Sequence, residues 1–288
     1  MKGLFVFLTA GAVSLTGLHA ELQVASLSTI TTEIATTVGG DKVNVIPIIK
    51  PGMDPHGFEP TPRDMKQIAK ADLVLITGKG LEGYLSKLEP ATGGKDKFLD
   101  VGGAFPSLKL EEDGQTVEDP HWWHSVANMK KAVVVVEERF IALDPINKAT
   151  YEKKTAAYLE KLADLQKWAK LKIALLPPSQ RKLVTSHDAF QYFAHDYGFK
   201  IYSIQGISTD DQPSSKKVRD LINIIKVEGV KAVFFEDIEN PKVVAEITRE
   251  SGATVGGELY ADGLGAKKAT TYLDMVRYNI TTIVDGLK

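Results

Sequence analysis

The sequence predicts an α/β fold of two lobes, each a mainly parallel sheet flanked by helices, with one long rigid helix joining them. Two patterns support this prediction. Short apolar runs alternate with helical segments along the chain, which is typical of parallel strands covered by helices on both faces. One helical pattern, at 147–176, is about 30 residues long and at 1.5 Å per residue would span roughly 45 Å, enough to reach along both lobes.

The first 20 residues are predicted to be a secretory signal peptide outside the fold. Lys2 gives a positive start, an apolar run follows, and the small Ala20 precedes the expected cleavage point. The alternative for this segment is a buried N-terminal strand or an anchor. We therefore expect an N-terminal lobe at 21–145, the linking helix at 146–177 and a C-terminal lobe at 178–288.

In the N-terminal lobe, apolar runs predict strands and amphipathic spacing predicts helices. The expected strands lie at 22–27, 43–49, 72–78 and 98–101, and the expected helices at 28–37, 63–70, 81–88 and 128–142. A polar stretch at 107–119 carries five acidic residues and no apolar periodicity, so we expect a mobile surface loop there.

The linking helix is predicted from apolar side chains that recur at helical spacing, and Pro177 and Pro178 end it. These side chains are Tyr151, Tyr158, Leu162, Leu165 and Trp168. In the C-terminal lobe the expected strands lie at 182–186, 200–204, 231–236 and 254–259, and the expected helices at 189–197, 215–226, 242–251 and 272–287. Ligands of such folds bind beyond the carboxyl ends of the strands, so residues that follow the strands are candidate ligands.

Composition narrows the class of protein. A chain of 288 residues is long enough for two domains with cores of their own. The formal net charge of −2 argues against a nucleic-acid partner. The chain has no cysteine, which excludes disulfides and thiolate ligands and predicts a protein free in the periplasm, without a lipid-anchor cysteine. No apolar run after the signal peptide is long enough for a membrane helix.

Three histidines and one carboxylate stand in distinctive short segments. They are His56 in GMDPHGFEPTPRD, His121 in VEDPHWWH, His187 in VTSHDAFQYFAHDYGF and Asp262 in GELYADGLG. Three imidazoles and a carboxylate are a plausible tetrahedral set for Zn²⁺. Two of them lie in each half of the chain, so they can form one site only where two lobes face each other across a cleft.

Each of these residues also has a simpler interpretation. His56 could be a surface residue of a loop rich in glycine and proline, and His187 a structural residue at a strand end. His121 could be exposed beside a tryptophan pair that belongs to the core, although the two indoles could equally form an apolar wall that keeps water from a metal. Asp262 could be a turn residue, since glycines follow it closely.

Three further polar residues have open roles. His124 lies three positions after His121 and could share a metal with it on one helical turn, or point elsewhere. Glu236, at the end of a predicted strand, is a second carboxylate candidate or a hydrogen-bond partner of a ligand. His195 lies within a predicted helix, where we expect it to be exposed or hydrogen-bonded and not a ligand.

Together, the four segments resemble the metal-binding receptors of bacterial zinc and manganese ABC importers, the cluster A-I periplasmic solute-binding proteins that include the zinc-uptake receptors. The resemblance covers essentially all of the chain after the signal peptide. It implies two α/β lobes joined by one long helix, with a single ion at their interface held by His56, His121, His187 and Asp262. It also implies an ABC permease in the inner membrane as partner, leaves a metallochaperone open, and favours a monomer.

Two features of the resemblance bear on the metal. Manganese-selective members tend to carry a carboxylate at the third position, so His187 favours Zn(II) as the transported ligand, with Mn(II) as the alternative. Many zinc members carry a histidine-rich loop before the second ligand, whereas the matching 107–119 stretch is acidic and has no histidine. The predicted function is capture of Zn(II) and its delivery to the permease. Because histidines must lose their protons to bind a metal, affinity should fall as the pH drops through about 6.5.

Two rival functions belong to other classes. A secreted zinc hydrolase would use three histidines and a bound water, with Asp262 or Glu236 as general base, but the chain has no HExxH-like motif. A receptor for a metal chelate or an organic solute would hold an organic molecule in the cleft. We therefore expect a receptor for a metal ion and not an enzyme.

Overall fold

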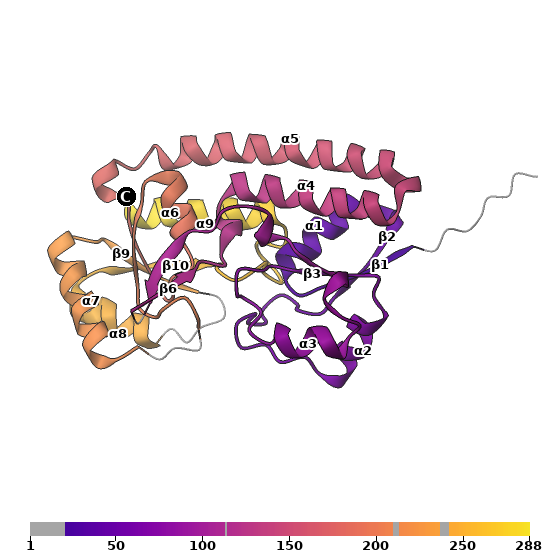
Figure 1. Cartoon of the computed structure of the whole chain (residues 1–288). Coiled ribbons are helices and arrows are strands. Elements are labelled where there is room, and N and C mark those ends of the chain that lie inside the picture. The colour runs from indigo at the N-terminus through magenta and orange to yellow at the C-terminus, as the bar shows by residue number, and fades with distance from the viewer. Residues whose placement is uncertain (1–20, 113, 210–212, 237–241) are drawn as a thin grey trace, which may run out of the picture.

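The computed structural model describes residues 21–288 apart from 113, 210–212 and 237–241. Figure 1 shows two lobes side by side, with the N-terminal lobe in indigo and purple and the C-terminal lobe in orange and yellow. Each lobe contains one four-stranded sheet in which every described strand pair is parallel. The predicted fold class is therefore confirmed. The predicted signal peptide lies outside the described residues.

The N-terminal sheet has the strand order β2-β1-β3-β4. Its strands are β1 (Leu22–Ser26), β2 (Val43–Pro47), β3 (Leu73–Ile76) and β4 (Phe98–Asp100). Helix α1 (Thr29–Gly39) packs on the face turned toward the linking helix, while α2 (Pro62–Lys70) and α3 (Leu85–Ala91) cover the opposite face. Since β3 is buried along its whole length, it reads in the sequence as a continuous apolar run.

The C-terminal sheet has the strand order β10-β9-β7-β8. Its strands are β7 (Lys182–Thr185), β8 (Lys200–Ser203), β9 (Ala232–Glu236) and β10 (Thr254–Leu259). Its helices are α6 (Gln191–Tyr197), α7 (Ser215–Glu228), α8 (Lys242–Ser251) and α9 (Tyr272–Leu287). Helices α7 and α8 pack on the outer face of the sheet, and α9 packs between the sheet and the linking helix.

Two long helices lie along the top of the molecule in Figure 1: α5 (Lys148–Ile173) extends over both lobes, and α4 (Val126–Leu143) runs beneath it over the N-terminal lobe. Helix α5 packs against α4 and α1 of the N-terminal lobe and against α9 of the C-terminal lobe. Its buried side chains recur at helical spacing, from Tyr151 through Tyr158 and Leu165 to Ile173. They belong to one apolar cluster that contains core residues of both lobes, while the opposite face of each sheet has a separate cluster of its own.

The acidic stretch at 107–119 is not the mobile loop that its composition predicts. It forms a hairpin of two antiparallel strands, β5 (Lys109–Glu112) and β6 (Gln115–Glu118). The hairpin contacts the C-terminal lobe: Ile207 donates its N–H to Glu112 at 2.7 Å, and Leu108 donates its N–H to the Tyr192 hydroxyl at 3.0 Å. Ile207 and Tyr192 lie far from the hairpin in sequence, so no local pattern predicts these contacts.

Helix α3 begins four residues later than predicted because the preceding turn is unusual. Gly78, Lys79 and Gly80 all have positive φ, and the Glu82 carboxylate accepts the N–H groups of Thr77 and Gly78 at 2.6 and 3.1 Å. The chain stays non-helical from this turn through residue 84, so the first four residues of the predicted helix are not part of it. Among the described residues, no helix is both long and apolar enough to cross a membrane.

Candidate metal centre

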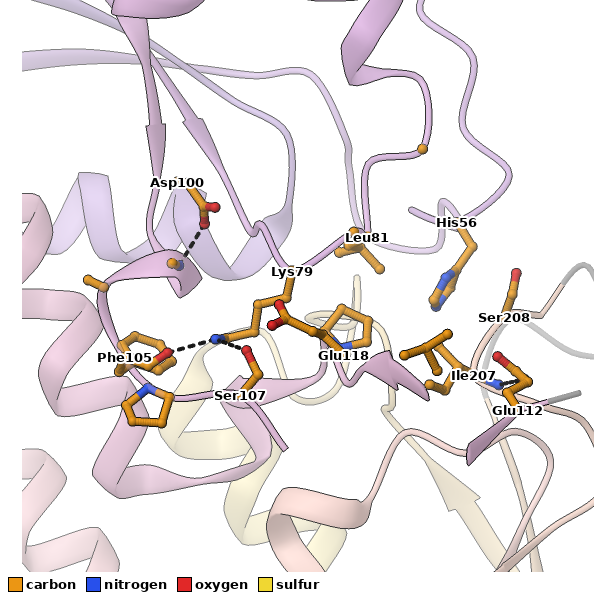
Figure 2. A pocket seen from close by; sticks show the side chains of 17 residues that line it. His56, Lys79, Leu81, Asp100, Phe105, Ser107, Glu112, Glu118, Ile207 and Ser208 are labelled. Atoms are coloured by element: carbon orange, nitrogen blue, oxygen red, sulfur yellow. Dashed lines mark hydrogen bonds between the residues drawn. The ribbon is translucent and has the colours of Figure 1, made fainter. Parts of the chain in front are cut away.

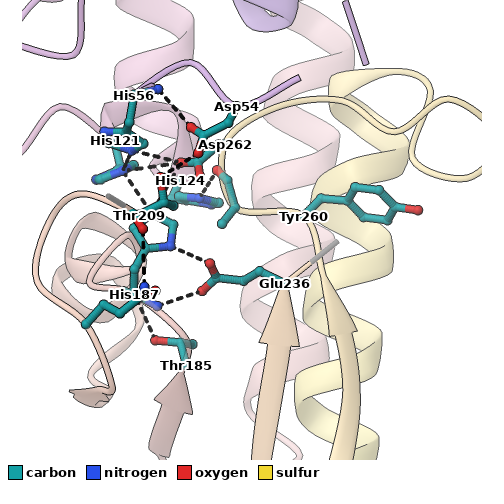
Figure 3. Close-up of polar contacts among 12 residues, drawn as sticks. Asp54, His56, His121, His124, Thr185, His187, Thr209, Glu236, Tyr260 and Asp262 are labelled. Carbon is teal, nitrogen blue, oxygen red and sulfur yellow. Dashed lines mark hydrogen bonds and ion pairs between the residues drawn. The ribbon is translucent and has the colours of Figure 1, made fainter. Parts of the chain in front are cut away.

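The four predicted ligands meet at the interface of the two lobes (Figure 3). His56 lies in the loop after β2, and His121 directly precedes the short 3₁₀ helix η4 (Trp122–His124) that leads into α4. His187 follows β7 and Asp262 follows β10, so three of the four lie beyond the carboxyl ends of strands, as the rule for parallel sheets predicts. One ligand atom from each residue lies within 4.8 Å of the others.

The ligand atoms form a small tetrahedron. The Nε2 atom of His121 lies 3.3 Å from the Nε2 atoms of both His56 and His187. Oδ1 of Asp262 lies 3.5, 3.4 and 3.3 Å from the Nε2 atoms of His56, His121 and His187. The side chains of His121 and His187 are fully buried, that of Asp262 is 3% exposed, and that of His56 is 6% exposed.

Two of the histidines are fixed by carboxylates that the ligand set itself does not use. Asp119 Oδ1 accepts the backbone N–H of His121 at 2.9 Å and contacts its Nδ1 at 2.8 Å. Glu236 does the same for His187, accepting its backbone N–H at 3.2 Å and pairing with its Nδ1. A carboxylate on Nδ1 keeps the proton there, so the lone pair of Nε2 points into the site.

His56 is held differently. Asp54 Oδ1 accepts its backbone N–H at 2.8 Å, but no described residue contacts its Nδ1. Sequence reasoning missed both Asp54 and Asp119, although the signal is present: Asp-Pro-His occurs at 54–56 and again at 119–121. An aspartate commonly hydrogen-bonds the backbone two residues further along, so each repeat forms a turn that presents its histidine.

Asp262 comes from the C-terminal half of the chain, yet its loop is attached to the N-terminal lobe. The carbonyl of Ala261 accepts hydrogen bonds from Trp123 Nε1 at 2.8 Å and from His124 Nε2 at 2.9 Å. Leu264, two residues after Asp262, donates its N–H to the Thr29 hydroxyl at 2.8 Å. A Cβ on Gly263 would lie 2.4 Å from that hydroxyl oxygen, which explains the glycine at this close approach.

The charges of the site are those of a cation receptor. Burial would raise the pKa of Asp262, but the imidazoles of His187 and His56 hold that pKa well below its usual 3.8. Burial would lower the pKa of His187, but the charges of Asp262 and Glu236 raise it well above 6.5. Both carboxylate oxygens of Asp262 are buried without a hydrogen bond. A buried anion without donors is costly unless a cation balances it, so the arrangement is suited to hold a metal ion.

The structure also locates His124, Glu236 and His195, whose roles the sequence left open. His124 is not part of the cluster: burial and the nearby His121 lower its pKa to about 3, and as a neutral imidazole it anchors the Asp262 loop through Ala261. Glu236 is a hydrogen-bond partner of His187. His195 lies in α6 with a side chain that is 70% exposed, away from the site. The tryptophan pair is buried, and Trp123 packs edge-on against the His121 ring.

A cavity of about 1150 Å³ lies beside the site and is lined by residues of both lobes (Figure 2). His56 is the one member of the four that contributes to its wall. The turn at 78–83, the hairpin residues Glu112 and Glu118, and Ile207 and Ser208 of the C-terminal lobe form much of the rest. The cavity therefore meets the cluster at His56.

Two lobes that enclose a buried cluster of cation ligands at their interface define a solute-binding receptor for a metal ion. The chain belongs to the family described as zinc-uptake complex component A, periplasmic, whose model matches residues 24–286. Receptors of this family bind metals for ABC transporters and are not enzymes. They work with a permease and an ATPase of the inner membrane.

Individual relatives carry different metals in their names. The manganese-binding lipoprotein MntA of Bacillus subtilis is 36% identical over 276 residues, covering 93% of this chain and 90% of the relative. The iron-binding protein YfeA of Yersinia pestis is 32% identical over 268 residues, covering 92% and 86%. The structure of the periplasmic zinc-binding protein TroA of Treponema pallidum superposes with a TM-score of 0.88 at 29% identity, covering 93% of this chain and 99% of TroA.

The relatives correct one prediction. MntA and several streptococcal metal receptors are named lipoproteins, so the prediction of a protein without a lipid anchor, free in the periplasm, is wrong. That prediction rested on the absence of cysteine alone, which was too narrow a ground for it. An extracytoplasmic location is what the relatives support.

Proposed function

We propose that this chain is an extracytoplasmic receptor that captures Zn²⁺ with His56, His121, His187 and Asp262 and delivers it to the permease of an ABC importer. We further propose that capture occurs between an N-terminal lobe at 21–145 and a C-terminal lobe at 178–288. The alternative within the same family is a manganese receptor.

The observation that carries the zinc proposal is the size of the tetrahedron. Five of its six edges measure 3.3–3.5 Å, and the sixth is within 4.8 Å. A regular tetrahedron with edges of 3.3–3.5 Å has its centre about 2.0–2.1 Å from each corner, which is the bond length of Zn²⁺ to imidazole and carboxylate, and a sixth edge of 4.8 Å would lengthen this distance to about 2.4 Å. Three nitrogens and one oxygen also suit Zn²⁺ better than Mn²⁺, which prefers oxygen ligands and six-coordination.

One feature favours manganese. Oδ2 of Asp262 is buried and accepts no hydrogen bond, so the carboxylate could bind through both oxygens and raise the coordination number. The name of MntA points the same way for that relative. Which metal the site prefers has therefore to be measured by direct competition between zinc and manganese.

A hydrolase is disfavoured by the same geometry. Catalytic zinc usually keeps one position for water, whereas Asp262 lies at similar distances from all three histidines and fills the fourth corner. Glu236, the other candidate base, is already engaged by the backbone and ring of His187. Reversible capture needs neither a water position nor a free base.

The test is metal analysis of the purified protein, followed by zinc and manganese titrations of wild type, His187→Ala and the matched control His195→Ala. We expect one zinc per chain, at least a hundredfold weaker zinc binding by His187→Ala, and no change in His195→Ala, because His195 is exposed and outside the cluster. Stronger binding of manganese than of zinc would overturn the metal assignment. Equal affinities of His187→Ala and wild type would overturn the ligand set.

A further inference from the structure

The two Asp-Pro-His turns are alike in sequence but differ in what the aspartate does. In both, the carboxylate accepts the backbone N–H of the histidine, at 2.8 Å for His56 and 2.9 Å for His121. Asp119 then uses the same oxygen to hold the imidazole Nδ1 of His121. Asp54 makes no such contact with the ring of His56, and its second oxygen is directed elsewhere.

That second oxygen reaches the opposite lobe. Asp54 Oδ2 accepts a hydrogen bond from the Thr209 hydroxyl at 2.6 Å, across 155 positions of sequence (Figure 3). The bond is short and one partner is a carboxylate, which makes it stronger than a bond between neutral groups. The segment before Thr209 is attached to the N-terminal lobe as well, through the bond from Ile207 to Glu112.

The other three ligands are held by more than one contact each. His121 and His187 are clamped at their rings by Asp119 and Glu236, and the Asp262 loop is attached through Ala261 and Leu264. His56 also borders the cavity, which the other three ligands do not. Of the four ligands, His56 is thus the one histidine without a carboxylate on its ring among the described residues, and the aspartate that holds its backbone is itself bonded across the lobes to Thr209.

Resting on the proposed metal-binding function, we propose that Thr209 and Asp54 are positioning residues that form an interlobe latch, which holds His56 in its ligand position. When the C-terminal lobe shifts and the Thr209 hydroxyl leaves Asp54, His56 is the first ligand to turn away, and the metal leaves into the cavity. The latch converts a relative movement of the lobes into loss of one metal bond, which is what a carrier needs when it docks on a permease.

The experiment measures zinc release from the full-length protein by rapid mixing with an excess of a chromophoric chelator. Thr209→Val removes the hydroxyl and keeps the shape, Thr209→Ser keeps the hydroxyl, and Thr36→Val is the matched control, because the Thr36 hydroxyl bonds within its own helix on an exposed surface. We expect release about tenfold faster in Thr209→Val, a wild-type rate in the other two, and association rates within about twofold throughout.

NMR spectroscopy distinguishes the latch from a merely structural role of Thr209. In NMR spectra of isotope-labelled histidine with zinc bound, Thr209→Val should broaden the ring signals of His56 and leave those of His121 and His187 sharp. An unchanged release rate in Thr209→Val, or a Thr209→Ser variant as fast as Thr209→Val, would overturn the latch. Failure of the wild type to bind one zinc would instead overturn the proposed function, so the two failures are distinguishable.

Discussion

The metal site has two sides that are built differently. The core side, residues 119–124 and 259–264, is buried against the tryptophan pair and is joined by several hydrogen bonds between segments far apart in sequence. The cavity side, residues 54–57, 78–83 and 205–209, borders the cavity and is joined across the lobes by the bond between Thr209 and Asp54. We infer that the core side contributes most of the affinity and that the cavity side determines which ligand leaves the metal first.

The largest effect is expected on the core side. Asp262→Asn removes the one negative charge among the four ligands while keeping the shape of the side chain, and zinc binding should weaken at least about a thousandfold, or about 4 kcal/mol. Competition with a chromophoric chelator measures this. Asp285→Asn is the matched control, because Asp285 is an exposed partner of Lys172. A loss below tenfold for Asp262→Asn would show that the carboxylate is not a ligand.

A pH-dependent effect is expected on the cavity side. Burial raises the pKa of Glu82 from 4.5 to about 7, although its carboxylate accepts two backbone N–H groups of the turn at 77–83. The folded state therefore holds the proton more tightly than the unfolded state. Glu82 contributes its full stability below pH 4.5, and this contribution, about 3 kcal/mol, is lost as the pH rises to about 7.

Glu82→Gln tests this contribution, because glutamine resembles the protonated acid at every pH. Urea unfolding with chelator present should give the variant a stability relative to wild type that increases by about 3 kcal/mol between pH 4.5 and pH 8. The measurement at low pH serves as the internal control, since both chains are then neutral at this position. A stability difference between variant and wild type that is independent of pH would show that burial does not raise the pKa of Glu82.

A smaller loss is expected when the carboxylate partner of the His187 ring is weakened. Glu236→Gln keeps one acceptor oxygen but cannot engage both the backbone N–H and the Nδ1 of His187 as the carboxylate does. Zinc affinity should fall by about tenfold to a hundredfold, the usual cost of removing such a partner. The exposed Glu160→Gln is the control. If the Glu236 variant bound zinc with unchanged affinity, the carboxylate would not support His187 as a ligand.

The smallest effect concerns how the Asp262 loop is anchored. Tyr272 donates its hydroxyl to the carbonyl of Trp123 at 2.7 Å, and its removal in Tyr272→Phe should cost about 1 kcal/mol of unfolding free energy. Zinc release should stay within about twofold of wild type, because Ala261 and Leu264 keep their bonds. Urea unfolding and the chelator chase measure the two quantities. Fast release from this variant would mean that the core side also gates the metal.

Much of the fold could be predicted because its signals are local. The alternation of apolar runs and helical spacing predicts the strands of both sheets and most helices, and the periodic side chains of α5 predict the long helix. The four candidate ligands could be named because their segments resemble those of the metal-receptor family, and because parallel strands bring their carboxyl ends together. The prediction of a protein without a lipid anchor was wrong because it used an absent residue type and not a pattern.

Tertiary structure alone decided how the ligands are held. The hairpin at 109–118 carries no apolar periodicity, and it is held by partners such as Tyr192 and Ile207 in the other lobe. The anchoring of Asp262 to the N-terminal lobe and the bond from Thr209 to Asp54 join residues more than 130 positions apart. Sequence periodicity reports which side chains are buried, but not which distant polar group each one meets. That pairing is fixed only when the two lobes pack.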